Sequence, residues 1–383
     1  MKKNLLIQLL ICLTLAACSP AVPINDPSSS EVPPKLTATM ELPTVQPDPS
    51  FRGFSVIDAL GREVKFSQTP VRIALAGRGS TLVIDALYLF PEARERLVTI
   101  GKGSQGPENF VGLIDPKLGD KPVLPPDVSP EQLAALKPDG VILKSYNSEK
   151  LGTPLESLGI PVVYVDFETP DQYWRDLASL GKVFQNEPRA EEIISYYKNR
   201  LAVVEKGLAG LEETKKPRQL LLYYSAKDGE VAFNVAPAGY IQTLMIKMAG
   251  GVPVWTEMQL EKGWTKVSFE QIAVWDADQI FIVDYTGNVD EVVEGLKADS
   301  NWQQLRAIKD SMIFAFPKDF VSWDQADPRW VLGLMWMAKT TYPDRFTELD
   351  IEKEARLFFE KMYGINEDGF VKSIEPKIIG NYK

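Results

Sequence analysis

The feature that most constrains the fold is a seven-residue segment that occurs twice in the chain. Val128–Ala134 has the sequence Val-Ser-Pro-Glu-Gln-Leu-Ala, and Val267–Ala273 has the sequence Val-Ser-Phe-Glu-Gln-Ile-Ala. In both copies an aspartate follows the glutamate by eight residues and precedes an apolar run. The serine can cap a short helix, and the glutamine can close a capping box with it. Chance recurrence of a common helix start is the alternative, but the matching context favours two lobes of similar build.

Short apolar runs alternate with helical patterns along most of the chain. We expect strands at Val71–Leu75, Leu97–Ile100, Val141–Leu143, Val162–Val165, Gln219–Tyr224, Gln279–Val283 and Met312–Phe316. Helical patterns lie between them, at Thr81–Phe90, Pro130–Leu136, Leu151–Leu158, Tyr240–Ala249, Phe269–Trp275, Val289–Leu296 and Trp330–Thr341. Such alternation is typical of parallel sheets that helices cover on both faces.

A longer helical stretch separates the two groups of strands. It runs from Asp171 to about Gly207 with Pro188 as its only breaker, which predicts two abutting helices or one kinked helix. We therefore predict an α/β fold of two Rossmann-like lobes with parallel central sheets, joined by a long helix, with a ligand cleft between them. The predicted boundaries are 51–170 for the N-terminal lobe, 171–215 for the helical linker and 216–383 for the C-terminal lobe.

The N-terminus has the features of an export signal. Lys2 and Lys3 precede an apolar stretch, Leu5–Leu15, that is too short to span a bilayer. Leu-Ala-Ala then leads directly to Cys18, as in the bacterial lipobox. This predicts a signal peptide over 1–17, lipid on Cys18 and anchoring to the extracytoplasmic face of the cell membrane. The Pro/Ser/Thr-rich residues 18–50 would form a disordered tether. A plain secretory signal with a chance cysteine is the alternative.

Two absences in the composition exclude several classes of chemistry. Histidine does not occur, and the two cysteines are Cys12 and Cys18. The mature chain therefore has no intrachain disulfide, no CxxC site and no histidine-based catalysis or zinc site. A purely carboxylate mechanism remains open. The formal net charge is −10 without a basic stripe, which argues against nucleic acid as a partner. We expect no cofactor and no metal site built from the chain itself.

Four further motifs, taken in their order and spacing, resemble a known family. They are Leu133–Ile142, Leu155–Val162, Met248–Gly251 and Trp264–Glu270. Together with the repeat they resemble the substrate-binding proteins of ABC importers for iron–siderophore complexes, haem and cobalamin, whose lobes are joined by one long helix. The resemblance covers about Phe54 to Phe370. It implies a monomeric binding protein, not an enzyme, that delivers a small-molecule ligand to an ABC permease dimer with its ATPase.

The resemblance also assigns a role to the repeated glutamates. In the family, one surface glutamate on each lobe docks onto arginines of the permease, and the matching positions here are Glu131 and Glu270. A carboxylate at a helix start lies at the favourable end of the helix dipole, and arginine can bind it with two hydrogen bonds. The alternative is that each glutamate is only a solvated residue at a helix start.

Candidate ligand contacts lie in the loops beyond the carboxyl ends of the predicted strands, where open α/β lobes bind ligands. Each has an alternative: the Gly-Arg-Gly segment can be a simple turn, an aromatic can anchor its loop, and the arginine before Trp330 can pair with Asp324 or Asp327. The candidates are Arg78, Ser80 and Tyr146 in the first lobe, and Tyr240, Trp264, Trp323 and Arg329 in the second.

The ligand class follows from what the chain lacks. Because the chain has no histidine and no free thiol, it offers no soft side-chain ligands for a bare transition metal. Only a tyrosine or a methionine could ligate the iron of haem. An iron chelate of the ferric siderophore type brings its own ligands and needs only arginines and aromatics, so it fits best. Cobalamin, a corrinoid that also arrives fully ligated, is second. An oxyanion such as molybdate needs many hydrogen-bond donors and little aromatic surface, so these candidate residues favour it less than a chelate.

Two other classes remain as rivals. A secreted carboxylate-pair hydrolase needs two carboxylates roughly 5 or 6.5–9.5 Å apart in one pocket. The repeat instead places its two glutamates on separate lobes, which disfavours this class. A surface adhesin or sensor lipoprotein with the same fold and no transport role stays open.

Overall fold

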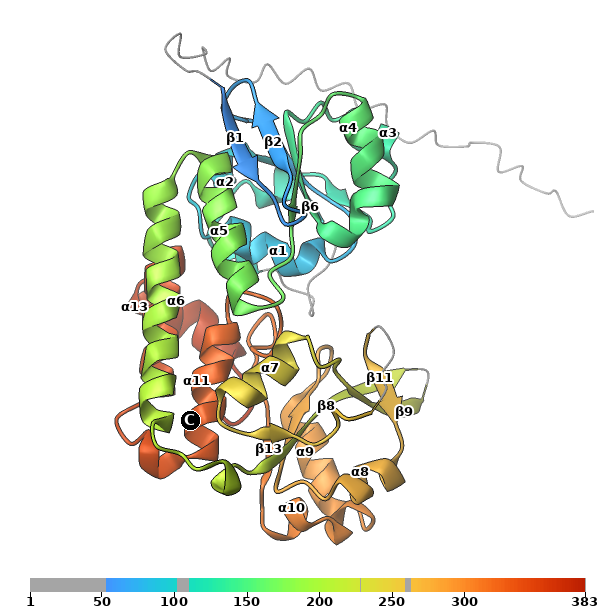
Figure 1. Ribbon diagram of the computed structural model, residues 1–383, viewed down its shortest axis with the longest axis vertical. Helices are drawn as coiled ribbons and strands as arrows, with labels where there is room; N and C mark the ends of the chain where they lie inside the picture. Colours follow the sequence, from blue (N-terminus) through green and yellow to red (C-terminus); the bar gives the residue numbers. More distant parts are fainter. Residues whose placement is uncertain (1–52, 102–109, 228, 259–262, 383) are drawn as a thin grey trace, which may run out of the picture. The chain divides into compact units, whose positions relative to one another are not determined.

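The computed structural model describes residues 53–101, 110–227, 229–258 and 263–382. These residues belong to one compact unit that holds a five-stranded sheet, a six-stranded sheet and a two-stranded hairpin (Figure 1). The predicted signal peptide, Cys18 and the tether over 18–50 lie outside the described residues. Among the described residues, no helix has the length and apolar character needed to cross a bilayer.

The first sheet has five parallel strands in the order β5-β4-β3-β6-β7. Every residue of β6 and β7 is buried, as expected for a parallel sheet covered on both faces. An antiparallel hairpin of β1 and β2 precedes the sheet. The elements are β1 (Phe54–Ile57), β2 (Glu63–Phe66), β3 (Ile73–Leu75), α1 (Ser80–Leu87), α2 (Ala93–Arg96), β4 (Leu97–Gly101), β5 (Val123–Leu124), α3 (Pro130–Ala134), β6 (Gly140–Lys144), α4 (Thr153–Ser157) and β7 (Val162–Val165).

The second sheet has a parallel centre and an antiparallel edge. Strand β8 lies parallel to β10 and β12, and β12 lies parallel to β13, whereas β9 and β11 add antiparallel pairs. The strands are β8 (Arg218–Lys227), β9 (Glu230–Val235), β10 (Val252–Pro253), β11 (Thr265–Val267), β12 (Gln279–Val283) and β13 (Ile313–Ala315). The helices are α7 (Ile241–Met248), α8 (Phe269–Trp275), α9 (Val289–Ala298), α10 (Arg306–Lys309), α11 (Trp330–Thr341), α12 (Ile351–Tyr363) and α13 (Glu367–Gly369). The parallel sheets were predicted, but the antiparallel edge was not.

Two helices connect the sheets, α5 (Pro170–Phe184) and α6 (Glu187–Leu208). They abut because Gln185 adopts a left-handed conformation and the Asn186 side chain caps α6 by accepting a hydrogen bond from Arg189 N at 3.2 Å. Pro188 lies in the first turn of α6, where a missing N–H costs nothing. The prediction of two abutting helices is correct. The exact lobe boundaries at 170 and 215 stay a prediction.

The repeated segment starts a helix with a serine N-cap in both lobes, whereas the capping box predicted for both copies is found in α3 and not in α8. Ser129 caps α3 with a full capping box, and Ser268 caps α8 by accepting from Gln271 N at 3.2 Å. The two repeated aspartates also act alike. Asp139 accepts from Arg72 N at 2.8 Å and Asp278 accepts from Arg218 N at 2.6 Å.

Each of these arginines also reaches back to the end of the repeated helix. The Arg72 guanidinium donates to Leu136 O at 2.8 Å, and the Arg218 guanidinium donates to Trp275 O at 2.7 Å. In both lobes the arginine therefore joins the start of the central strand to the helix that carries the repeated glutamate.

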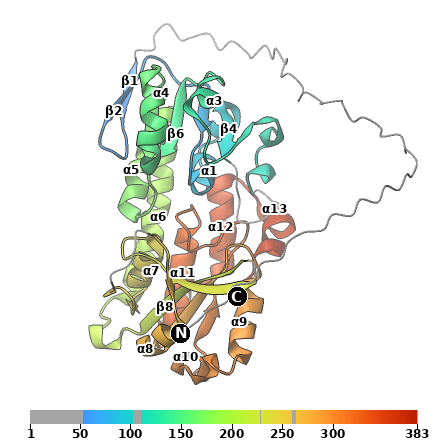
Figure 2. The same cartoon turned by 90° about the vertical axis from the view of Figure 1, so that its right-hand side faces the viewer.

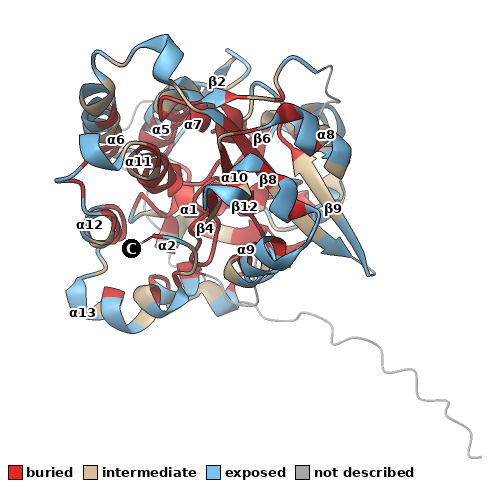
Figure 3. Cartoon of the chain, turned by 90° about the horizontal axis from the view of Figure 1, so that it is seen from below, coloured by how far each residue is buried: buried red, intermediate tan, exposed pale blue. Residues whose placement is uncertain are grey.

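The central strands of both sheets carry the colour of buried residues in Figure 3.

Candidate ligand and docking sites

Three site loops meet at the carboxyl edge of the first sheet. Arg78 follows β3, Tyr146 follows β6 and Glu168 follows β7. The Tyr146 hydroxyl donates to Arg78 O at 3.1 Å. The Asn147 amide donates to the same oxygen at 3.0 Å and accepts from Arg78 N at 3.2 Å. The backbone of the Arg78 loop is thus fixed, while its guanidinium is exposed and forms no ion pair with any residue that the structure describes.

Glycines allow this close approach. Gly79 has φ +74°, and a Cβ there would lie 1.9 Å from the Tyr146 hydroxyl oxygen. Gly77 has φ +78°, and a Cβ there would lie 3.0 Å from Asn147 Cγ. Both residues therefore need the left-handed backbone and the absence of a side chain. The Gly-Arg-Gly segment and Tyr146 were both predicted from the sequence as parts of the site, but their contact with each other was not.

Ser80 lies beneath this loop and not on its surface. Its side chain is buried, and a Cβ on Gly101 would lie 1.7 Å from the Ser80 hydroxyl oxygen. The serine therefore packs against the end of β4, directly before residues 102–109, which lie outside the described residues. Ser80 as a ligand contact stays a prediction.

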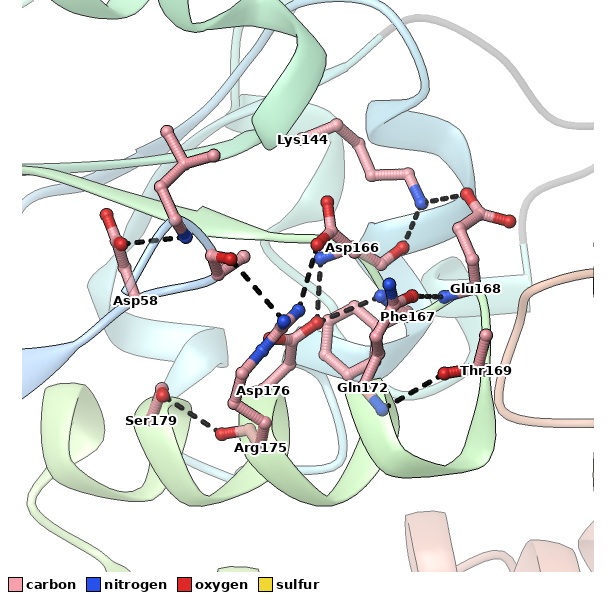
Figure 4. A network of polar contacts seen from close by, with 12 residues as sticks. Asp58, Lys144, Asp166, Phe167, Glu168, Thr169, Gln172, Arg175, Asp176 and Ser179 are labelled. Carbon is pink, nitrogen blue, oxygen red and sulfur yellow. Dashed lines mark hydrogen bonds and ion pairs between the residues drawn. The ribbon is translucent and has the colours of Figure 1, made fainter. Parts of the chain in front are cut away.

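A buried lysine positions Glu168 in this loop cluster. The Lys144 ammonium is 2.5 Å from a Glu168 carboxylate oxygen and also donates to Asp166 O. Asp166 in turn pairs with Arg175 at 2.9 Å. Figure 4 shows this network, in which Asp176 also accepts hydrogen bonds from the backbone after β7. The residues after β7 are thus anchored from both the sheet and α5.

Tyr240, from the second lobe, is linked electrostatically to the loops after β6 and β7. It precedes α7 at that helix's N-cap position. Burial, followed by the negative charge of Glu168, raises the pKa of Tyr240. Tyr146 is 61% exposed, but partial desolvation of its hydroxyl, the charge of Glu168 and the neighbouring Tyr240 raise its pKa to about 12. The two tyrosines and the carboxylate therefore lie close enough to interact, although they come from both lobes, and both hydroxyls stay protonated donors at neutral pH.

Three aromatic rings of the second lobe pack together near the ends of its strands. Tyr223 of β8 stacks on Tyr285, which follows β12, with ring centroids 4.4 Å apart. Trp264 packs edge-on to both rings, at 5.4 and 6.1 Å. Trp264 is half-buried and keeps part of its ring accessible. Trp264 was predicted as a ligand contact, but Tyr223 was not, because a residue inside a predicted strand gives no sign of facing a ligand.

The structure places Trp323 and Arg329 in the interior. Trp323 is 0% exposed and donates to Asp319 at 2.8 Å. Arg329 is 0% exposed and forms ion pairs with Asp85 at 2.6 Å, Asp319 at 2.7 Å and Asp327 at 2.8 Å. Neither side chain offers a surface to a ligand here, so the site proposed below omits both. Of the two partners that the sequence suggested for Arg329, Asp327 pairs with it.

Asp324 has other partners. Its carboxylate accepts from the Tyr285 hydroxyl at 2.8 Å and from the Gln242 amide at 3.2 Å. It therefore supports the base of the aromatic cluster instead of holding the arginine.

Glu131 and Glu270 are exposed at the starts of α3 and α8. In both cases the backbone N–H at the helix start and then the capping serine lower the pKa of the carboxyl group. Neither carboxylate forms an ion pair within the described ranges. Two equivalent, unpaired carboxylates are therefore available for a partner that carries positive charge.

The arrangement of two lobes and a helical connection is also found by comparison with known proteins. The model of a periplasmic binding protein family matches residues 120–320, which include both copies of the repeat. The chain belongs to this family. As a member it is the substrate-binding protein of an ABC importer, works outside the cytoplasm and is not an enzyme.

Individual relatives differ in what they bind. The molybdate-binding protein MolA of Haemophilus influenzae is 25% identical over 258 residues, which cover 62% of this chain and 70% of the relative. The vitamin B12-binding protein of Salmonella typhimurium is 26% identical over 204 residues, 53% of this chain and 69% of the relative. A periplasmic solute-binding protein of Veillonella parvula superposes with a TM-score of 0.67 at 26% identity, covering 84% of this chain and 97% of the other.

Proposed function

We propose that this chain captures an iron complex of the ferric siderophore type between its lobes and delivers it to the importer's permease. One observation carries the proposal: the Tyr146 hydroxyl and the Asn147 amide hold the backbone of Arg78, at the carboxyl edge of the first sheet. The influence of Glu168 on the pKa of both Tyr146 and Tyr240 supports a site that the two lobes share. The exposed Arg78 guanidinium belongs to the same loop cluster as Tyr146. Neutral phenol donors and one guanidinium suit the oxygen-rich outer surface of a metal chelate.

The electrostatics of this cluster disfavour two other ligand types. The negative charge of Glu168 raises the pKa of both tyrosines, so a tyrosinate that ligates haem iron is unfavourable. The same carboxylate would repel a small dianion held between the two hydroxyls. A chelate spreads its charge over a larger volume and can use the accessible part of Trp264 as an apolar contact.

Molybdate is the second candidate, and the similarity to MolA favours it. Cobalamin is an alternative of the same importer family, supported by the similarity to the vitamin B12-binding protein. Both relatives share only about a quarter of their residues with this chain. A direct comparison of ligands is therefore needed.

Intrinsic tryptophan fluorescence can make this comparison on the chain from residue 51 onward. Ferric siderophores, haem, cobalamin and molybdate are titrated in turn, and the ferric chelate should quench with the highest affinity. Arg78→Ala should weaken binding at least tenfold, whereas Lys361→Ala, an exposed cation on α12, should not change it. Saturable binding of molybdate alone, or of cobalamin alone, would replace the iron complex as the ligand.

We further propose that Glu131 and Glu270 dock the two lobes onto the permease dimer. Their matched position at helix starts and their unpaired carboxylates support this role. Replacing both by Ala should abolish uptake and leave ligand affinity unchanged. Normal uptake by this double variant would exclude the docking role.

The lipid on Cys18 remains part of the proposal. A lipid anchor and a tether would hold a monomeric binding protein near its permease and raise its effective concentration there. Cys18→Ala should release the chain from the membrane fraction, which fractionation of cells would measure.

A further inference from the structure

A hollow of about 550 Å³ lies in the second lobe, between the β8–β9 hairpin and α9. Three aromatic side chains line it, Tyr224, Phe233 and Trp302, together with Val231, Val292 and Leu296. Tyr224 and Phe233 are partners across the hairpin and lie on the same face of the sheet. Tyr223 points to the opposite face, because successive side chains of a strand alternate. The hollow is therefore separate from the aromatic cluster around Trp264.

The hollow exposes apolar surface that no described residue of its lobe covers. Val231 is 50% exposed at the rim, and Tyr224 and Phe233 are only half-buried. The rings form a continuous wall, with Phe233 4.9 Å from Trp302 and 5.8 Å from Tyr224 between centroids. Apolar surface gathered in a concave patch is typical of an interaction site.

The rim of the hollow is acidic. Glu291 and Asp299 line it, and neither forms an ion pair with a described residue. Asn288 donates to Glu291 at 2.9 Å, and the backbone N–H groups of residues 301 and 302 donate to Asp299. These neutral donors fix the carboxylates and leave their negative charge uncompensated. A partner that combines an apolar side chain with a basic one would match this surface.

The hollow is continuous with the proposed docking helix. Phe269, the first residue of α8, lies with its ring 5.8 Å from the ring of Trp302, which lines the hollow. Glu270 is the next residue. Figures 1 and 2 show α8 and α9 at the same end of the second lobe. The wall of the hollow therefore reaches, through Trp302 and Phe269, the residue that precedes Glu270 in the chain.

We propose that this hollow is part of the docking surface and receives an apolar side chain from a basic extracytoplasmic segment of the importer's permease. The inference rests on the docking role proposed for Glu270. The carboxylates supply electrostatic attraction, and the hollow supplies the apolar contact that fixes the orientation of the second lobe on its permease subunit.

Gly295 gives a direct test. It lies on α9 in the wall of the hollow, and a Cβ there would meet no atom within 4 Å. Gly295→Phe places a ring at the wall of the hollow from a position where a Cβ has free space, and Gly295→Ala also raises helix propensity but leaves the hollow open. The full lipidated chains are combined with the ATPase-bound permease in proteoliposomes, and association and uptake of the ligand are measured.

Gly295→Phe should weaken association at least tenfold and lower uptake, while its ligand affinity in solution stays within twofold of the wild type. Gly295→Ala should behave as the wild type. Val231→Arg, at the exposed rim, should also weaken association at least tenfold because it repels a basic segment. If Gly295→Phe does not fold, Val231→Arg tests the role of the hollow on its own.

Wild-type association by both hollow variants would overturn the inference. If the Glu131/Glu270 double variant still abolishes uptake in that case, the docking glutamates stand and only the hollow is excluded. If the double variant also docks normally, the docking role itself falls. A dimer of this chain that Gly295→Phe dissociates would show that a second copy, not the permease, occupies the hollow.

Discussion

Replacing Arg329 by Met would leave three buried aspartates without their shared cation. The guanidinium contacts Asp85 at 2.6 Å, Asp319 at 2.7 Å and Asp327 at 2.8 Å, and every one of these side chains is almost fully buried. It also lies over the ring of Phe110 at 4.6 Å. Methionine keeps the length and the apolar contact of the side chain but removes the charge, so the variant isolates the electrostatic contribution.

Removing one partner of a buried ion pair costs about 3–5 kcal/mol, because the remaining charge is buried without compensation. With an unfolding entropy of about 2.1 cal/mol/K per residue and on the order of 320 folded residues, this corresponds to a fall in Tm of roughly 4–7 °C. The loss of stability caused by Arg329→Met should be smaller at pH 5 than at pH 8. Burial already raises the pKa of Asp85 to about 7 and also raises the pKa of Asp319, so acid can neutralise the carboxylates that lost their cation.

Thermal unfolding followed by circular dichroism at pH 5 and pH 8 measures both effects. Lys372→Met is the control, because Lys372 pairs with Asp368 at 2.6 Å but both side chains are about 70% exposed. This exposed pair should contribute under about 1 kcal/mol, which corresponds to a Tm shift of about 1.5 °C or less. A shift for Arg329→Met as small as that of the control, or one equal at both pH values, would refute the reasoning.

Three further predictions concern single positions. Folding raises the pKa of Asp85, so the stability that this group contributes is present below about pH 4 and is lost as the pH rises through about 7. The Tm of the wild type should therefore fall between pH 5 and pH 8, and Asp85→Asn should make that fall smaller. Gly79→Ala should weaken ligand binding at least tenfold, because its Cβ would lie 1.9 Å from the tyrosine hydroxyl, whereas Gly61→Ala, with a similar φ and no atom within 4 Å, should leave the affinity measured by fluorescence titration unchanged. Trp264→Ala should weaken binding about 3- to 10-fold in calorimetry, the range expected for loss of an aromatic contact; an affinity equal to that of the wild type would remove this ring from the site.

The repeat could be read from the sequence because its interactions are local. The serine caps and the glutamates lie within one helical turn of each other, and the structure gives them the same roles in both lobes. The arginines that complete each copy, Arg72 and Arg218, were missed because they lie 64 and 57 residues from the carbonyl groups they bind. Nothing in the spacing of the sequence indicates that pairing.

The segment from Phe320 to Trp330 shows why Trp323 and Arg329, two candidate ligand contacts, lie outside the proposed site. The sequence placed both residues in a loop before a helix, where an aromatic ring or an arginine can contact a ligand. In the structure the whole segment is buried, because Arg329 pairs with Asp85, 244 positions earlier in the chain. The same reasoning succeeded for Arg78 and Tyr146 only in placing them beyond the strand ends. Their contact depends on two glycines whose backbone conformation the sequence suggested and the structure defines.

The Asn147 side chain has a consequence for the speed of ligand capture. Its amide makes three hydrogen bonds, two to the backbone of Arg78 and one to Lys144 O, so the loops after β3 and β6 are held together in the conformation described here. A ligand that meets a loop already in place loses little time to rearrangement and has little ordering entropy to overcome. Capture should therefore follow a single exponential whose rate rises linearly with ligand concentration, and Asn147→Ala should slow association more than it speeds dissociation.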